Sequence, residues 1–99
     1  MYLVRDIMFC KPGQARPMVK KFLALSKLMD GHGVSGMRVM TDVSAERYWT
    51  VVSEIEVESL EIYAEFTKRT MAMKEFQEAM AGYHDLVLQG RREIYQIER

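Results

Sequence analysis

The stretch that decides the fold reads Arg47-Tyr48-Trp49-Thr50-Val51-Val52-Ser53-Glu54-Ile55-Glu56-Val57. Aromatic and β-branched residues dominate it, so we expect a strand over 47–57. Successive side chains of a strand point to opposite faces of its sheet. One alternation contains Val51, Ile55 and Val57, and the other contains Val52 among polar residues. Both faces of this strand therefore carry apolar side chains.

The segment from Tyr2 to Cys10 is also rich in β-formers and predicts a first strand, again with apolar residues in both alternations. Lys11-Pro12-Gly13 then breaks the strand. The period changes to that of a helix over 15–29, with one stripe made of Val19, Phe22, Leu23, Ser26 and Met29. We expect this helix to end at Asp30-Gly31-His32-Gly33, with Gly31 as its cap.

A further strand is predicted over 35–41, and the polar turn 42–46 joins it to 47–57 as an antiparallel hairpin. Residues 58–90 favour helix, which we divide near Thr70 and end at Gly90. Alternation through Ile94, Tyr95 and Ile97 predicts a final strand over 91–98.

The predicted order β-α-β-β-α-β is typical of a ferredoxin-like α+β fold, here one domain over 1–99. Its first and third strands lie in the centre, the second beside the third and the fourth beside the first. Both helices cover one sheet face. The other face is apolar too, and no segment remains to cover it. We therefore expect a homodimer that buries the open sheet face of each copy.

Composition excludes several classes of protein. The 99 residues contain 14 Lys and Arg and 14 Asp and Glu, which argues against a nucleic-acid binder. A single cysteine, Cys10, excludes an internal disulfide. Two histidines without ligand spacing predict no metal site, and no cofactor motif is present. Charged residues interrupt the first residues too soon for the apolar core of a signal peptide. No apolar run is long enough to span a membrane, so we expect a cytoplasmic protein.

The chain resembles the dimeric α+β barrel superfamily, and most closely its NIPSNAP-like and antibiotic-biosynthesis-monooxygenase-like members. The resemblance rests on Lys11-Pro12-Gly13, on 54–60, on Glu75-Phe76-Gln77 and on 90–95. It implies two ferredoxin-like sheets that close face to face. The superfamily includes cofactor-free oxygenases, haem-degrading enzymes, isomerases and members without known activity, so the resemblance leaves all of these functions open. The oxygenases and haem-degrading enzymes of this superfamily rely on an Asn, a Trp and a His in the active-site pocket. Trp49 and His84 could match two of these, but the chain contains no asparagine.

Strand alternation gathers Asp6, Arg38 and Glu54 on neighbouring strands. In a partly dry cavity such a cluster could raise the pKa of a carboxyl group and create a general base, with Arg38 stabilising an oxyanion. The alternative is a structural charge cluster that fixes the register of the dimer. Arg91-Arg92, in contrast, are interpreted as solvated surface residues.

The aromatic residues and histidines leave similar alternatives. His84, on the apolar stripe of the last helix, could be a general base or a haem ligand, or a hydrogen-bonded residue at the edge of the core. His32 is interpreted as a loop residue. Trp49 is a core residue or, together with Tyr48, Tyr83 and Tyr95, a wall of a ligand pocket.

Three functions compete at this point. The first is a cofactor-free oxygenase or isomerase that acts on a small aromatic or polyketide-like compound, with Asp6, Glu54 or His84 as base. The second is a non-catalytic homodimeric module that binds a small apolar ligand or a partner protein. The third, which the sequence favours least, is haem binding through His84.

Overall fold

The computed structural model describes residues 1–99. Its two central strands are β1 (Tyr2–Cys10) and β3 (Thr50–Val57). They pair antiparallel, with Arg5 opposite Glu54. The outer strands are β2 (Arg38–Thr41), beside β3, and β4 (Val87–Gln96), beside β1. The sheet order β2-β3-β1-β4 confirms the predicted ferredoxin-like α+β arrangement.

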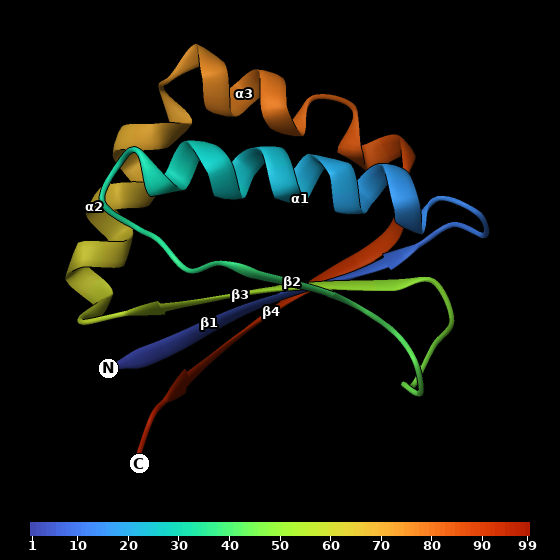
Figure 1. Ribbon diagram of the computed structural model, residues 1–99, viewed down its shortest axis with the longest axis horizontal. Coiled ribbons are helices and arrows are strands. Elements are labelled where there is room, and N and C mark those ends of the chain that lie inside the picture. Colours follow the sequence, from blue (N-terminus) through green and yellow to red (C-terminus); the bar gives the residue numbers. More distant parts are fainter.

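All helices lie on one face of this sheet, and no helix covers the other (Figure 1). They are α1 (Ala15–Asp30), α2 (Leu60–Met71) and α3 (Lys74–Met80), and a 3₁₀ turn follows at Tyr83–Asp85. The predicted division near Thr70 is confirmed. Ser59 caps α2, because its hydroxyl accepts a hydrogen bond from the amide of Ile62 at 3.1 Å. None of these helices is long and apolar enough to span a membrane.

The core lies between the helices and the helix-facing side of the sheet, in two clusters. One cluster forms near α2 and α3, from Val4, Met29, Val34, Ile55, Val57, Phe66 and Phe76. The other forms under the first half of α1, from Cys10, Met18, Val19, Phe22 and Val51. Leu23, which the predicted stripe placed in the core, is 54% exposed, because the buried stripe runs through Met18 instead.

Several predicted boundaries are wrong. The strand expected from 35 begins at Arg38, and the strand expected from 47 begins at Thr50. The helical region ends at Met80 rather than at Gly90. Gly82 ends it, with a φ of 80° that few other residues adopt, whereas Gly90 lies within β4 opposite Met8. The last strand therefore begins at Val87 rather than at 91.

Candidate functional site

The open sheet face is defined by the register of the strands. Arg5, Ile7 and Phe9 of β1 point away from the helices, because Val4, Met8 and Cys10 pack against them. The register adds the partners of these residues on β3 and β4, which are Glu54, Val52 and Thr50 on one side and Glu93, Arg91 and Gln89 on the other. From β2 it adds Arg38 and Met40. Apolar and charged side chains therefore alternate along the open face.

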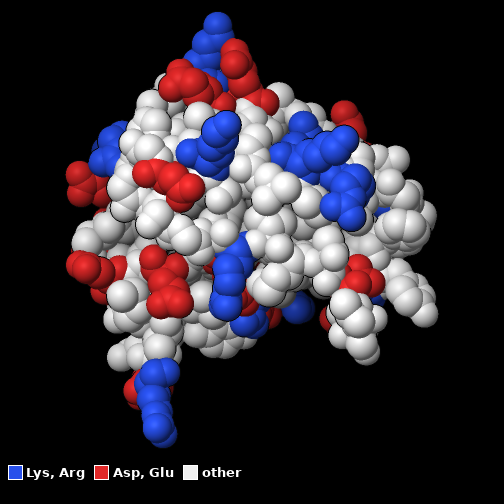
Figure 2. Space-filling view, in the orientation of Figure 1, with Lys and Arg blue, Asp and Glu red and all other residues white.

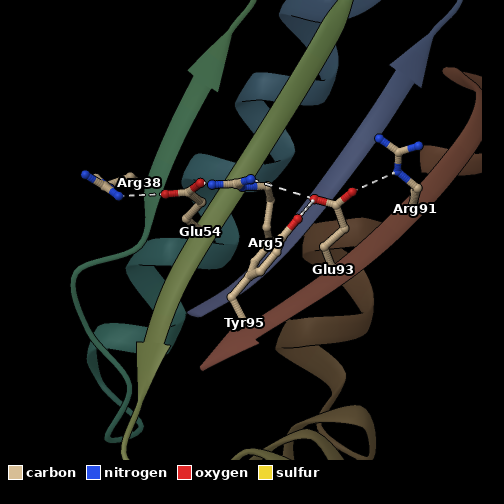
Figure 3. Close-up of polar contacts among 6 residues, drawn as sticks. All are labelled: Arg5, Arg38, Glu54, Arg91, Glu93 and Tyr95. Carbon is tan, nitrogen blue, oxygen red and sulfur yellow. Dashed lines mark hydrogen bonds and ion pairs between the residues drawn. The ribbon is translucent and has the colours of Figure 1, made fainter. Parts of the chain in front are cut away.

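A row of opposite charges crosses all four strands of this face (Figure 3). It consists of Arg38, Glu54, Arg5, Glu93 and Arg91, and we call it the charged row. Each oxygen of Glu54 accepts a hydrogen bond at 2.6 Å, one from Arg38 and the other from Arg5. Glu93 then faces Arg5 at 3.7 Å and Arg91 at 3.3 Å. The hydroxyl of Tyr95 donates to Glu93 at 2.9 Å.

Glu54 is the buried member of the charged row, since only 6% of its side chain is exposed. Burial raises the pKa of this carboxyl group, but the hydrogen bonds and charges of Arg5 and Arg38 outweigh burial, so its pKa lies below the ordinary value. The expected upward shift is therefore wrong for Glu54. With both oxygens occupied and the charge stabilised, Glu54 is suited to a structural ion pair rather than to proton abstraction.

Asp6 does not join Arg38 and Glu54, and that expectation is wrong. It lies one residue along β1 from Arg5 and so points to the helix-facing side. There it accepts hydrogen bonds from Nε and Nη2 of Arg92 at 2.6 and 3.3 Å. The guanidinium of Arg92 lies 5.7 Å from the ring centre of Tyr63. Burial raises the pKa of Tyr63 above its ordinary value.

A cleft of about 430 Å³ opens beside the charged row, between the sheet and the loop 42–49 that joins β2 to β3. We call it the open-face cleft. Its floor is apolar and is formed by Ile7, Phe9, Met40 and Val52. Arg5, Glu54 and Arg91 border it on one side, and Asp42 and Glu46 of the loop border it on the other. The loop extends below the sheet on the side that has no helices (Figure 1).

Trp49 and Tyr48 border a different cleft, at the edge of the sheet beside the start of α1. This edge cleft measures about 570 Å³ and is also lined by Ala15, Arg16, Val19, Thr41 and Asp42. Trp49 precedes β3, adopts a φ of 63° and is 43% exposed, so its interpretation as a core residue is wrong. Tyr48 is 85% exposed.

The remaining predicted residues are scattered. Tyr83 packs against the core cluster under α1, while Tyr95 lies on the open face. His84 lies in the 3₁₀ turn rather than on a helix, is exposed, and stacks on Tyr83 with 4.0 Å between ring centres. It lines neither of these clefts, nor a third cleft of about 620 Å³ that its neighbours Gly82 and Asp85 border. The four predicted pocket residues, Trp49, Tyr48, Tyr83 and Tyr95, thus do not surround one cavity.

His32 is more enclosed than a solvated loop residue. Its Nδ1 lies 2.8 Å from the carbonyl oxygen of Leu28, and its ring meets Phe76 edge-on at 5.2 Å. These contacts fix the turn after α1 and explain its position without a catalytic role. No three His, Cys, Asp or Glu side chains are grouped so that they could hold a metal ion.

Two arginines of these sites, Arg5 and Arg47, were not singled out from the sequence. Arg91 and Arg92 are exposed, as their interpretation as solvated surface residues predicts, but the sequence did not indicate their partners. The structure places Arg91 on the open face and Arg92 on the helix-facing side, each paired with a carboxylate. The alternation of β1 would have identified Arg5, because it shares a face with Ile7 and Phe9. No sequence signal points to Arg47. Its guanidinium lies 4.4 Å from the ring centre of Phe9, a contact that depends on the path of the loop 42–49.

Charges on the rest of the molecule are dispersed. Figure 2 shows Lys and Arg interspersed with Asp and Glu over most of the visible face, with one group of adjacent Lys and Arg side chains at the upper right. This distribution agrees with the formal net charge of zero. It leaves the open face and its cleft as the most organised polar arrangement.

Comparison with family models and with curated proteins finds no match. Solved structures match along nearly the whole chain. An uncharacterised NIPSNAP domain protein from Burkholderia xenovorans has a TM-score of 0.82 at 12% identity, over 98% of this chain and 94% of that chain. A NIPSNAP family protein from Agrobacterium tumefaciens has a TM-score of 0.74 at 17% identity, over 96% and 90%.

A candidate antibiotic biosynthesis monooxygenase from Nitrosomonas europaea has a TM-score of 0.76 at 11% identity, over 100% of both chains. The predicted resemblance to NIPSNAP-like and antibiotic-biosynthesis-monooxygenase-like proteins is therefore confirmed for the fold. At these identities the likeness extends to the fold alone.

Proposed function

We propose that this protein is a homodimeric module that binds a small apolar or aromatic molecule in the open-face cleft. The observation that carries the proposal is the cleft itself. Its volume of about 430 Å³ falls within the range of roughly 300–1,000 Å³ common for ligand pockets. An apolar floor with a few polar side chains at the border is the usual composition of such sites.

The polar groups beside the floor are largely occupied within the protein. Glu54 is held by Arg5 and Arg38, and Oδ1 of Asp42 accepts a hydrogen bond from the amide of Thr50 at 2.9 Å. A ligand therefore gains most of its binding free energy by covering Met40 and Val52, since Ile7 beneath them is already buried. This is the reason for proposing an apolar or aromatic ligand.

A second copy of the chain is the proposed cover of the open face. Met40 is 38% exposed there and Tyr95 is 47% exposed, although both are large apolar side chains. The charged row alternates in sign, so two copies related by a twofold axis can place arginines of one row beside glutamates of the other. Such a dimer would also enclose the cleft.

Catalysis by a cofactor-free oxygenase or isomerase is the second candidate. It is favoured by the full-length fold likeness to a candidate monooxygenase. The predicted bases support it less well, because Asp6 and Glu54 lie on opposite faces and each is held by arginine. Haem binding through His84 has less support still, since His84 lines none of the three clefts of about 430, 570 and 620 Å³.

The test is methionine-methyl NMR of the protein during titration with a neutral aromatic probe, indole. We expect the Met40 methyl signal to shift, because Met40 lines the cleft, whereas Met71, 69% exposed on α2, should not shift. Val52→Phe should fill the floor of the cleft and weaken binding at least tenfold. The matched variant Ile62→Phe, on the exposed side of α2, should bind normally.

Light scattering on both variants checks that neither substitution changes the oligomeric state. An unchanged Met40 signal at millimolar indole, or equal binding by wild type and Val52→Phe, would contradict the proposal.

A further inference from the structure

Phe9 forms one end of the floor of the open-face cleft, and two guanidinium groups lie over its ring. The central carbon of Arg47 lies 4.4 Å from the ring centre, and that of Arg91 lies 5.7 Å from it. Phe9 is consequently only 5% exposed, although it belongs to the open face. Cation–π attraction holds both groups at this end of the cleft.

Arg47 has no carboxylate partner. Its one hydrogen bond to a side chain is from Nη1 to the amide oxygen of Gln89, at 3.3 Å. A guanidinium carries five N–H donors in its plane, and stacking on a ring leaves these donors free at the edge. Arg47 therefore presents unused donors and an uncompensated positive charge beside the cleft.

Arg91 is only partly neutralised. Its Nε lies 3.3 Å from Glu93, but Glu93 also receives the hydroxyl of Tyr95 and faces Arg5. Asp42 accepts from the amide of Thr50, and neither Asp42 nor Glu46 forms an ion pair with either arginine.

The cleft therefore has two different ends. At one end Glu54 neutralises Arg5 and Arg38. At the other end Arg47 and Arg91 both lie against the ring of Phe9, where Glu93 pairs with Arg91 and no carboxylate pairs with Arg47. We propose that the ligand of this cleft is a monoanionic ring carboxylate. Its ring covers Met40 and Val52, and its carboxylate receives hydrogen bonds from Arg47 and Arg91. This inference rests on the proposed function and names the ligand class of the same site.

A carboxylate matches this end better than a larger or more highly charged anion. Arginine forks bind a carboxylate with two parallel N–H···O bonds. One uncompensated guanidinium balances one negative charge. The apolar floor leaves room for the ring but offers no further cation to a second anionic group.

The experiment compares 2-naphthoate with its neutral counterpart 2-naphthamide, by titration monitored at the Met40 methyl signal. We expect naphthoate to bind at least tenfold more tightly. Arg47→Gln should remove most of this preference, and Arg91→Gln should reduce it, while the affinity for naphthamide should fall much less, because its amide carries no charge. Arg99→Gln, the same change of charge at the last residue, should leave both affinities as in the wild type.

The outcomes separate the two proposals. If both compounds shift Met40 and bind equally, the carboxylate inference fails while ligand binding in the cleft stands. If the preference persists in both variants, Arg47 and Arg91 are not its source and the inference is also overturned. If neither compound shifts Met40, the proposed function fails together with the inference.

Discussion

Glu54 is the side chain on which the open face depends most. It is buried, yet each of its oxygens has an arginine at hydrogen-bond distance. Removing one partner of a buried ion pair leaves the other charge without compensation. The arrangement is therefore more costly to break than its few contacts suggest.

We predict that Glu54→Gln lowers the free energy of unfolding at pH 7 by about 2 kcal/mol, as expected for the loss of charged hydrogen bonds. The pKa of Glu54 is lowered in the folded state. Its stabilising contribution is therefore complete above the unfolded pKa of about 4.3 and is lost as the pH falls through the lower folded pKa. Urea unfolding from pH 7 to pH 2 should show a weaker acid-induced loss of stability in the variant.

Glu56→Gln is the matched control, because Glu56 lies on the same strand and face but is exposed and without an ion pair. If the two variants have the same stability and the same pH dependence, Glu54 does not stabilise the sheet in the way described.

At Trp49 the alternation of apolar residues along the strand predicts the wrong backbone conformation and burial. Its aromatic side chain extends the alternation of β3 backwards, so the sequence favours a strand residue within the core. The backbone instead turns into the left-handed region at Trp49, which the pattern of apolar residues does not encode. The hydrogen bond from the amide of Cys10 to its carbonyl oxygen, at 2.9 Å, fixes this turn against β1.

At the scale of the elements, hydrophobic period indicated the order of strands and helices, and strand order and helix cover followed from that order. Element ends were less predictable. Both Gly82 and Gly90 can end a helix. Which of them does so depends on where the chain must turn so that β4 can pair with β1. Similarly, placing Asp6 beside Glu54 required the relative register of β1 and β3, and a shift of one residue changes the face.

The two glycines give a testable contrast. We predict that Gly82→Ala destabilises the protein by about 1 kcal/mol, because a φ of 80° disfavours any residue with a Cβ atom. Gly90→Ala should cost less. Its backbone is ordinary, and the nearest atom to a new Cβ is the flexible Sδ of Met8 at 3.2 Å. Thermal unfolding of both variants measures the difference, and a larger loss for Gly90→Ala would contradict this account of the helix end.

At the scale of the whole molecule, the open face should decide the oligomeric state. We predict a mass twice the 11.6 kDa of one chain in light scattering at micromolar concentration. Met40→Asp, on the open face, should weaken the dimer by about 2 kcal/mol or more, as expected for a charge placed in an interface core.

Leu23→Asp is the control, because Leu23 is exposed on the helix layer, at 54%. A wild-type monomer would contradict the dimer. Dissociation by Leu23→Asp alone would place the interface on the helices.

The charged row also bears on how the chain chooses one strand alignment during folding. In a sheet with one apolar face, a slip of one residue exposes the apolar side chains and is rejected for that reason. Here β1 and β3 carry apolar residues on both faces, so a slipped pairing would still bury many of them. It would, however, bring Ser53 or Ile55 opposite Arg5 in place of Glu54. The carboxylate would then be separated from its cations, so electrostatic pairing discriminates between alignments that hydrophobic burial alone would leave close in free energy.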